Sequence, residues 1–138
     1  MHSGGVWFLD YNGNYLWDGG TVDKLRYWGW PGTTPMVGNW NGDGKSKLGA
    51  YIDGVWFLDY NGDFIWDGGT GDKVVWMGWP GTTPVVGDWN GDGTTKVGAF
   101  IDGYWFLDYN GNFLWDGGSA DKVYVFGEAG DTPVVGRW

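Results

Sequence analysis

The chain repeats itself with a period of 49 residues. Residues 5–53 align without a gap on residues 54–102, and residues 103–138 begin a third copy that stops early. A period in this range is typical of β-propeller blades and of helical arrays. No segment shows the apolar period of a helix over even three turns. The repeat therefore predicts an all-β protein, with residues 1–138 forming a single fragment of a propeller.

The composition agrees with many short strands and narrows the range of partners. The chain has 29 glycines, which favour tight turns, and 13 tryptophans, 8 tyrosines and 7 phenylalanines, whose rings can supply most of the buried area. A formal net charge of −9 with scattered Lys and Arg disfavours nucleic acid. No apolar run approaches the roughly 20 residues of a spanning helix. Residues 1–4 show no signal peptide, so we expect no membrane insertion.

Four antiparallel strands are expected in each unit. The candidates in the second copy are residues 55–60, 63–66, 83–89 and 96–101. The first two flank Asn61-Gly62, a pair typical of two-residue type I′ hairpin turns, which would place Leu58 opposite Ile65. Residues 72–77 either extend the outer strand or lead to the next unit. Because large apolar residues would then lie on both faces, we expect the sheets to stack face to face like propeller blades.

The sharpest chemical signal is the loop GDWNGDGTTKVG at 87–98, with a counterpart at 38–49. Oxygen-bearing side chains stand at loop positions 1, 3 and 5 before a glycine, as in loops that wrap Ca²⁺. These candidate ligands are Asn39, Asn41 and Asp43 in the first copy and Asp88, Asn90 and Asp92 in the second. At position 9 stand Lys47 and Lys96, whose ammonium groups would repel Ca²⁺ or fill its place. Two interpretations stay open: a calcium site, or, as we favour, a turn stapled by lysine.

A second oxygen-rich pattern occurs three times, as Asp59-x-Asn61-x-Asp63-x-x-x-Asp67 in the second copy. The spacing again suits a calcium loop, but the glycine stands at position 4 rather than 6. The predicted hairpin accounts for these residues without a metal and would draw Asp59 away from Asp67. We therefore favour a structural role for them.

The NGDG loops carry a resemblance to a known family. Together with Phe126-Gly127 and the segment GDTPVVG at 130–136, they resemble the FG-GAP and VCBS-type repeats of β-propellers, known from integrin α-subunit heads and from surface proteins of bacteria and archaea. The whole 49-residue unit can be laid along one such blade. The resemblance implies an extracellular or cell-surface adhesion or scaffold module with Ca²⁺ in the loops. Lys47 and Lys96 depart from the family, which usually has an acidic ligand there, so no cofactor is required.

The aromatic residues suggest an alternative function. Tryptophans in the predicted hairpin strands are expected to be buried: Trp7, Trp17, Trp56, Trp66, Trp105 and Trp115. By contrast, Trp30 and Trp79 precede prolines in turn-rich segments where exposure is expected. Nearby, Arg26 and Tyr124 occupy equivalent positions whose residue type differs between copies. Such variation can indicate a ligand-binding surface or an unconstrained outer edge, and we favour the outer edge. Exposed rings could stack on sugars, which makes a lectin-like carbohydrate-binding module the alternative.

Catalysis is not expected from this sequence. The chain has one His, near its start, no Cys, and no Ser set beside a base. These absences disfavour nucleophilic and His-based acid–base designs. We therefore expect a non-catalytic binding or scaffold module.

The repeat register predicts self-assembly. Trp138 matches Trp89 and Met1 matches Ala50, so the break falls inside a blade. Three blades are fewer than the roughly four to eight of closed propellers, and exposed sheet edges tend to pair. We expect a six-bladed homodimer in which residues 132–138 of one chain lie beside residues 4–18 of the other, with a glycan or protein as a further ligand. The near-identity of the copies also suggests a designed or excised sequence.

Overall fold

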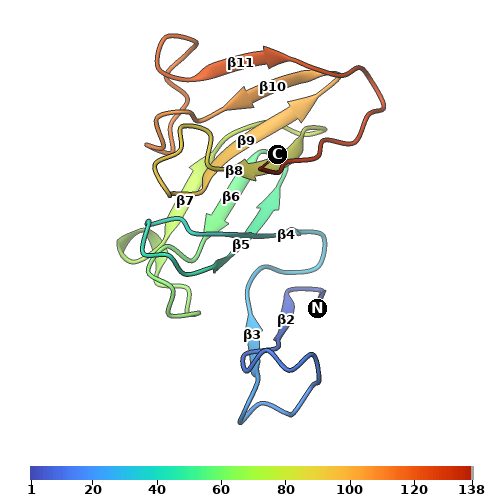
Figure 1. Ribbon diagram of the computed structural model, residues 1–138, viewed down its shortest axis with the longest axis vertical. Helices are drawn as coiled ribbons and strands as arrows, with labels where there is room; N and C mark the ends of the chain where they lie inside the picture. Colours follow the sequence, from blue (N-terminus) through green and yellow to red (C-terminus); the bar gives the residue numbers. More distant parts are fainter. Residues whose placement is uncertain (138) are drawn as a thin grey trace.

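A computed structural model describes residues 1–137 and shows an all-β protein with three antiparallel sheets. The sheets follow one another along the long axis of the molecule (Figure 1). Among the described residues the only helical element is a 3₁₀ turn, Gly68–Thr70, and no helix is long and apolar enough to cross a membrane. The expected all-β class is confirmed.

The sheets share one plan. The N-terminal sheet has the order β1 (His2–Ser3), β2 (Val6–Leu9) and β3 (Lys24–Tyr27). The central sheet has the order β4 (Thr34–Gly38), β5 (Lys47–Ile52), β6 (Val55–Leu58) and β7 (Lys73–Trp76). The C-terminal sheet repeats this order with β8 (Thr83–Gly87), β9 (Lys96–Ile101), β10 (Tyr104–Leu107) and β11 (Lys122–Val125). Residues 132–136 occupy the repeat positions of β4 and β8 but form no strand, and Trp138 lies outside the described residues.

Three of the four predicted strands are confirmed and one is wrong. Residues 55–60, 83–89 and 96–101 contain β6, β8 and β9. Residues 72–77 contain β7, the outermost strand of its sheet. Residues 63–66 form no strand, because β6 ends at Leu58 and pairs with β7. Leu58 therefore lies opposite Lys73 and not opposite Ile65.

The two-residue hairpin turn lies at Asp53-Gly54, between β5 and β6, rather than at Asn61-Gly62. Both turn residues have positive φ, 49° and 90°, as a type I′ turn requires. A Cβ on Gly54 would also lie only 2.5 Å from the carbonyl oxygen of Gly78. Both the positive φ and the lack of space for a side chain therefore require glycine here. The expected turn chemistry is present, but at another pair of residues.

The apolar core lies between the sheets, and the central sheet is covered on both faces. Leu48 and Ala50 of β5 pack with Trp7 and Trp28 of the N-terminal sheet. Their neighbour Tyr51 points the other way and belongs to the cluster with Val97 of the C-terminal sheet. This confirms the expected face-to-face stacking. Because both faces of β5 are covered, its successive residues from Lys47 to Tyr51 are all buried.

The burial predicted for six tryptophans holds for only some of them. Trp7 and Trp56 are buried, and Trp105 is half-buried. Trp17, Trp66 and Trp115, which were expected on the second strand of the hairpin, are exposed. They lie in irregular loops, where each ring packs edge-on against a strand phenylalanine and keeps its remaining surface in solvent.

Candidate functional sites

Lysine ammonium groups lie among the oxygens of both NGDG loops. The fully buried side chain of Lys96 brings its Nζ to 3.1 Å from Asp88 Oδ1, 2.6 Å from Asp92 Oδ1 and 3.0 Å from the carbonyl oxygen of Thr94. Lys47 likewise contacts Asp43 Oδ1 and lies 3.1 Å from the carbonyl oxygen of Lys45. The lysine staple expected from position 9 is therefore seen in both copies.

The lysines lower the pKa values of the carboxyl groups they contact. The hydrogen bond from Lys96 holds the pKa of Asp92 far below its ordinary value, and that from Lys47 lowers the pKa of Asp43. Burial raises the pKa of Asp88, but the amide of Gly93 and the Lys96 ammonium outweigh it and leave the pKa lowered. These groups stay ionised near neutral pH.

The remaining candidate metal ligands serve the loops themselves. Asn41 Oδ1 accepts a hydrogen bond from the amide of Asp43 (3.2 Å), and Asn90 Oδ1 accepts one from the amide of Asp92 (3.2 Å). Among residues 1–137 no group of three or more carboxyl or imidazole side chains is arranged to hold a metal ion. An ammonium and Ca²⁺ cannot share one place, so the oxygens as arranged here fit the lysine and not the ion.

Asn39 connects the two loops. Its amide and its side-chain Nδ2 donate to Thr95 Oγ1 (2.9 Å) and to the carbonyl oxygen of Gly93 (3.0 Å). The amide of Thr95 donates back to the carbonyl oxygen of Asn39 (2.9 Å). The three bonds link the central sheet to the C-terminal sheet, a role that the calcium-loop spacing gave no reason to expect.

The second oxygen-rich pattern forms a loop of successive side-chain-to-backbone turns. Asp59 Oδ1 accepts from the amide of Gly62 (2.9 Å), Asn61 Oδ1 from that of Asp63 (3.0 Å), and Asp63 Oδ1 from that of Ile65 (2.8 Å). These bonds satisfy amides that a strand would have paired, which is why no hairpin forms.

A buried aspartate anchors both ends of this loop. Asp72 Oδ1 accepts from the amide of Tyr60 (3.0 Å) and its Oδ2 from the amide of Asp67 (2.8 Å). Burial raises the pKa values of Asp72 and Asp59. The same pair of bonds recurs at Asp23 and Asp121, so the loop is a structural part of each unit.

The tryptophans divide into two classes by their indole N–H groups. Six donate to backbone carbonyl oxygens of the chain: Trp7, Trp28, Trp40, Trp56, Trp89 and Trp105. Among the described residues, six others have no acceptor within the chain, and all are exposed: Trp17, Trp30, Trp66, Trp76, Trp79 and Trp115. A buried indole N–H needs a partner, whereas an exposed one is free to meet water or a ligand.

Exposed tryptophans flank a cleft between adjacent sheets. A cavity of about 280 Å³ is lined by Tyr27, Trp28, Gly29, Trp30, Phe57 and Trp66. The Phe57 ring is 5.1 Å from that of Trp30 and 5.8 Å from that of Trp66, centroid to centroid. The next pair of sheets repeats the arrangement around Phe106, with Trp79 at 5.3 Å and Trp115 at 5.9 Å.

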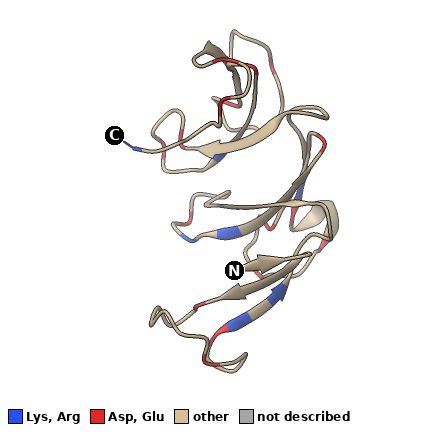
Figure 2. Cartoon of the chain, turned by 90° about the vertical axis from the view of Figure 1, so that its right-hand side faces the viewer, with Lys and Arg blue, Asp and Glu red and all other residues tan. Residues whose placement is uncertain are grey.

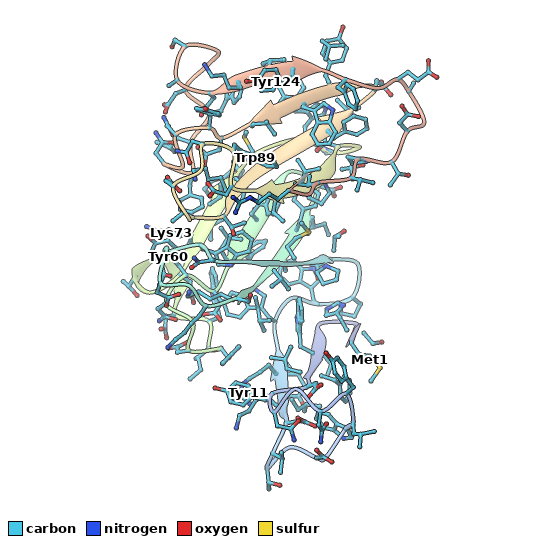
Figure 3. The ribbon with its side chains drawn as sticks, in the orientation of Figure 1. Met1, Tyr11, Tyr60, Lys73, Trp89 and Tyr124 are labelled. Atoms are coloured by element: carbon cyan, nitrogen blue, oxygen red, sulfur yellow. The ribbon has the colours of Figure 1, made fainter. Side chains whose placement is uncertain are left out.

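The four residues proposed as ligand contacts do not form one site. Trp30 and Trp79 are both 44% exposed, as expected, but lie in different clefts. The guanidinium of Arg26 covers the ring of Phe64 at 5.1 Å and does not line the cavity, and Tyr124 lies on β11 at one end of the molecule (Figure 3).

Phe57 and Trp66 were missed as site residues because both were assigned to a buried hairpin. Nothing in the sequence marks Trp66 as exposed, since it lies in the segment expected to form the second strand of the hairpin. A scan against protein-family models, a search of curated proteins and a search of solved structures found no match to the chain.

Proposed function

We propose that the protein is a non-catalytic, repeat-based scaffold of the propeller type, completed when a second copy closes the ring. One observation carries this proposal. The outward face of the C-terminal sheet is exposed, whereas the equivalent face of the central sheet is buried against its neighbour. Phe126 is 79% exposed whereas its equivalent Met77 is 4% exposed, and Tyr124 is 51% exposed whereas its equivalent Val75 is 2% exposed.

The opposite end presents the complementary surface. Tyr15 is exposed there, whereas its equivalents Phe64 and Phe113 are partly covered by Arg26 and Tyr60 of the preceding sheet. The two surfaces lie far apart, since Tyr124 is at one end of the molecule and Tyr11 and Met1 are toward the other (Figure 3). The internal packing therefore supports a head-to-tail contact between copies.

The packing also supports a radial arrangement. β4 and β8, the first strands of their sheets, contact each other, as the inner strands of neighbouring propeller blades do. A head-to-tail contact gives a closed ring only when its rotation completes a circle. Two copies of three sheets make six, within the roughly four to eight blades of closed propellers.

The chemistry of the described residues agrees with a non-catalytic role. The imidazole of His2 accepts a hydrogen bond from the amide of Gly5 (3.2 Å) and packs edge-on against Trp7. The aspartates with raised pKa values are buried loop anchors that hold backbone amides. An extracellular location rests on the resemblance to FG-GAP repeats.

The test is the absolute mass in solution by light scattering behind a sizing column. We expect about twice the 15.3 kDa of one chain, and F126E should give monomers because it places a charge in the contact. V125E is the matched control: Val125 and its equivalents Trp76 and Tyr27 are 70%, 69% and 71% exposed, so the side chain at this position stays mostly in solvent, and Tyr27 only borders the cleft between its sheets. A monomeric parent chain, or an F126E variant that assembles like V125E, would refute ring closure.

A further inference from the structure

We propose that the cleft between the N-terminal and central sheets is an aromatic cage for a quaternary ammonium group. The cage consists of Tyr27, Trp28, Trp30, Phe57 and Trp66, which line the cavity of about 280 Å³ together with Gly29. Its members all belong to one chain, so the proposal stands or falls independently of ring closure.

The rings form walls in different directions rather than one flat platform. Trp30 and Phe57 meet at 72°, Phe57 and Trp66 at 67°, and Trp66 and Trp28 at 70°. Nearly perpendicular aromatic walls are the arrangement that surrounds a quaternary ammonium with π-electron density. The cavity lies at the small end of ligand sites, which span roughly 300–1,000 Å³, and so suits a small headgroup.

The Trp28 ring and the backbone of Trp30 are held in place before any ligand arrives. The indole N–H of Trp28 donates to the carbonyl oxygen of Phe57 across the two sheets (2.9 Å). Thr33 Oγ1 donates to the carbonyl oxygen of Trp30 (2.8 Å) and accepts from its amide (3.3 Å). A preformed cage loses little conformational entropy on binding.

Polarity decides between an ammonium and a sugar. No Asp, Glu, Asn, Gln, Lys or Arg side chain lines the cavity, and its polar side-chain atoms are the Tyr27 hydroxyl and the indole N–H groups of the tryptophans. A saccharide would find few hydrogen-bond acceptors among the side chains that line the cleft. A quaternary ammonium has no donor to satisfy, and the net charge of −9, spread over the loops of all three sheets (Figure 2), attracts cations.

The equivalent aromatic group between the central and C-terminal sheets, called here the second cleft, provides a natural comparison. It keeps Trp79, Phe106 and Trp115. Trp76 stands where the first cleft has the exposed Tyr27, and Met77 stands where it has the buried Trp28. A thioether offers no π face to a cation. We therefore expect the first cleft to bind more tightly than the second.

The experiment is a titration with tetramethylammonium, followed through the indole N–H signals of the tryptophans by NMR. Binding should shift the signals of Trp30 and Trp66 first. The neutral isostere 3,3-dimethylbutan-1-ol should bind at least about tenfold more weakly, because it lacks the charge that a desolvated π face attracts. Choline, a trimethyllysine peptide and phosphatidylcholine vesicles then distinguish a free, a protein-borne and a lipid-borne ammonium.

The matched variants are W66L and W115L. Each keeps apolar bulk at an exposed position without an internal N–H bond, so folding is retained, and a superimposable thermal melt checks this. W66L should weaken tetramethylammonium binding about tenfold, and W115L less than about threefold. Equal binding of the neutral isostere, preference for simple sugars, equal effects of the two variants, or no saturable binding would each overturn the proposal.

Discussion

Replacing Lys96 with Met is expected to destabilise the protein by about 2 kcal/mol. Met keeps most of the buried stem and removes only the ammonium. The carbonyl oxygen of Thr94 then loses a hydrogen bond from a charged donor, worth about 1.5–3 kcal/mol. Asp88 and Asp92 add little, because both are more than one third exposed and water replaces the lysine there.

The assay is thermal and urea unfolding at pH 7, where this loss corresponds to a decrease in Tm of about 8 °C. K47M should cost less, because Lys47 has fewer acceptors than Lys96. The control is K45M, an exposed lysine of the first loop, which should change stability by less than about 0.5 kcal/mol. A K96M protein as stable as the parent would refute the reasoning.

Acid titration tests the electrostatic part of the same prediction. Because the folded-state pKa values of Asp88 and Asp92 are lowered, their stabilising effect is present above the ordinary value of 3.8 and is lost as the pH falls through the folded-state values. The stability difference between parent and K96M should therefore shrink slightly at low pH, while the larger part, the bond to the Thr94 carbonyl, does not titrate. A difference that grows on acidification would contradict the assignment of the lowered pKa values to Lys96.

Further predictions concern the turns and the loops. G54A should lower the free energy of unfolding by at least about 3 kcal/mol and G44A by about 1 kcal/mol. Both residues have positive φ, but only Gly54 would place a Cβ against the backbone of Gly78. Equal Tm losses in the two variants would contradict this. D72A removes two buried acceptors and should lower the free energy of urea unfolding by about 2–3 kcal/mol. The control is the exposed Asp63→Ala, which should lower it by less than about 1 kcal/mol. A smaller effect of D72A than of this control would contradict the anchor role. EDTA should leave the Tm unchanged, and a drop of several degrees would show that the loops need a metal.

The repeat and the apolar pattern predicted much of the fold. The all-β class, the strands β6, β8 and β9 and the coverage of both sheet faces follow from the repeat, the apolar segments and the turn residues between them. The lysine staples could also be predicted, because Lys47 and Lys96 stand at a ligand position and have the reach to enter the loop.

The failures have a common physical cause. Asn61-Gly62 has the composition of a hairpin turn, but Asp59, Asn61 and Asp63 satisfy the nearby amides with their own side chains. Side-chain oxygens compete with a pairing strand for the same backbone amides, and a rule that considers only the two turn residues does not take this competition into account. Trp66 was then wrongly assigned to the core, and with it the aromatic cage was missed, because the cage joins rings from two repeats across a sheet interface.

The lysine staples change what governs the stability of their loops. An ion taken from solution stabilises a fold in proportion to the logarithm of its free concentration. The ammonium groups of Lys47 and Lys96 are covalently tethered, so their local concentration is set by a side chain's length and by nothing in the medium. Loops built in this way hold their shape in calcium-rich and calcium-poor surroundings alike, and for the same reason they cannot report a change between them.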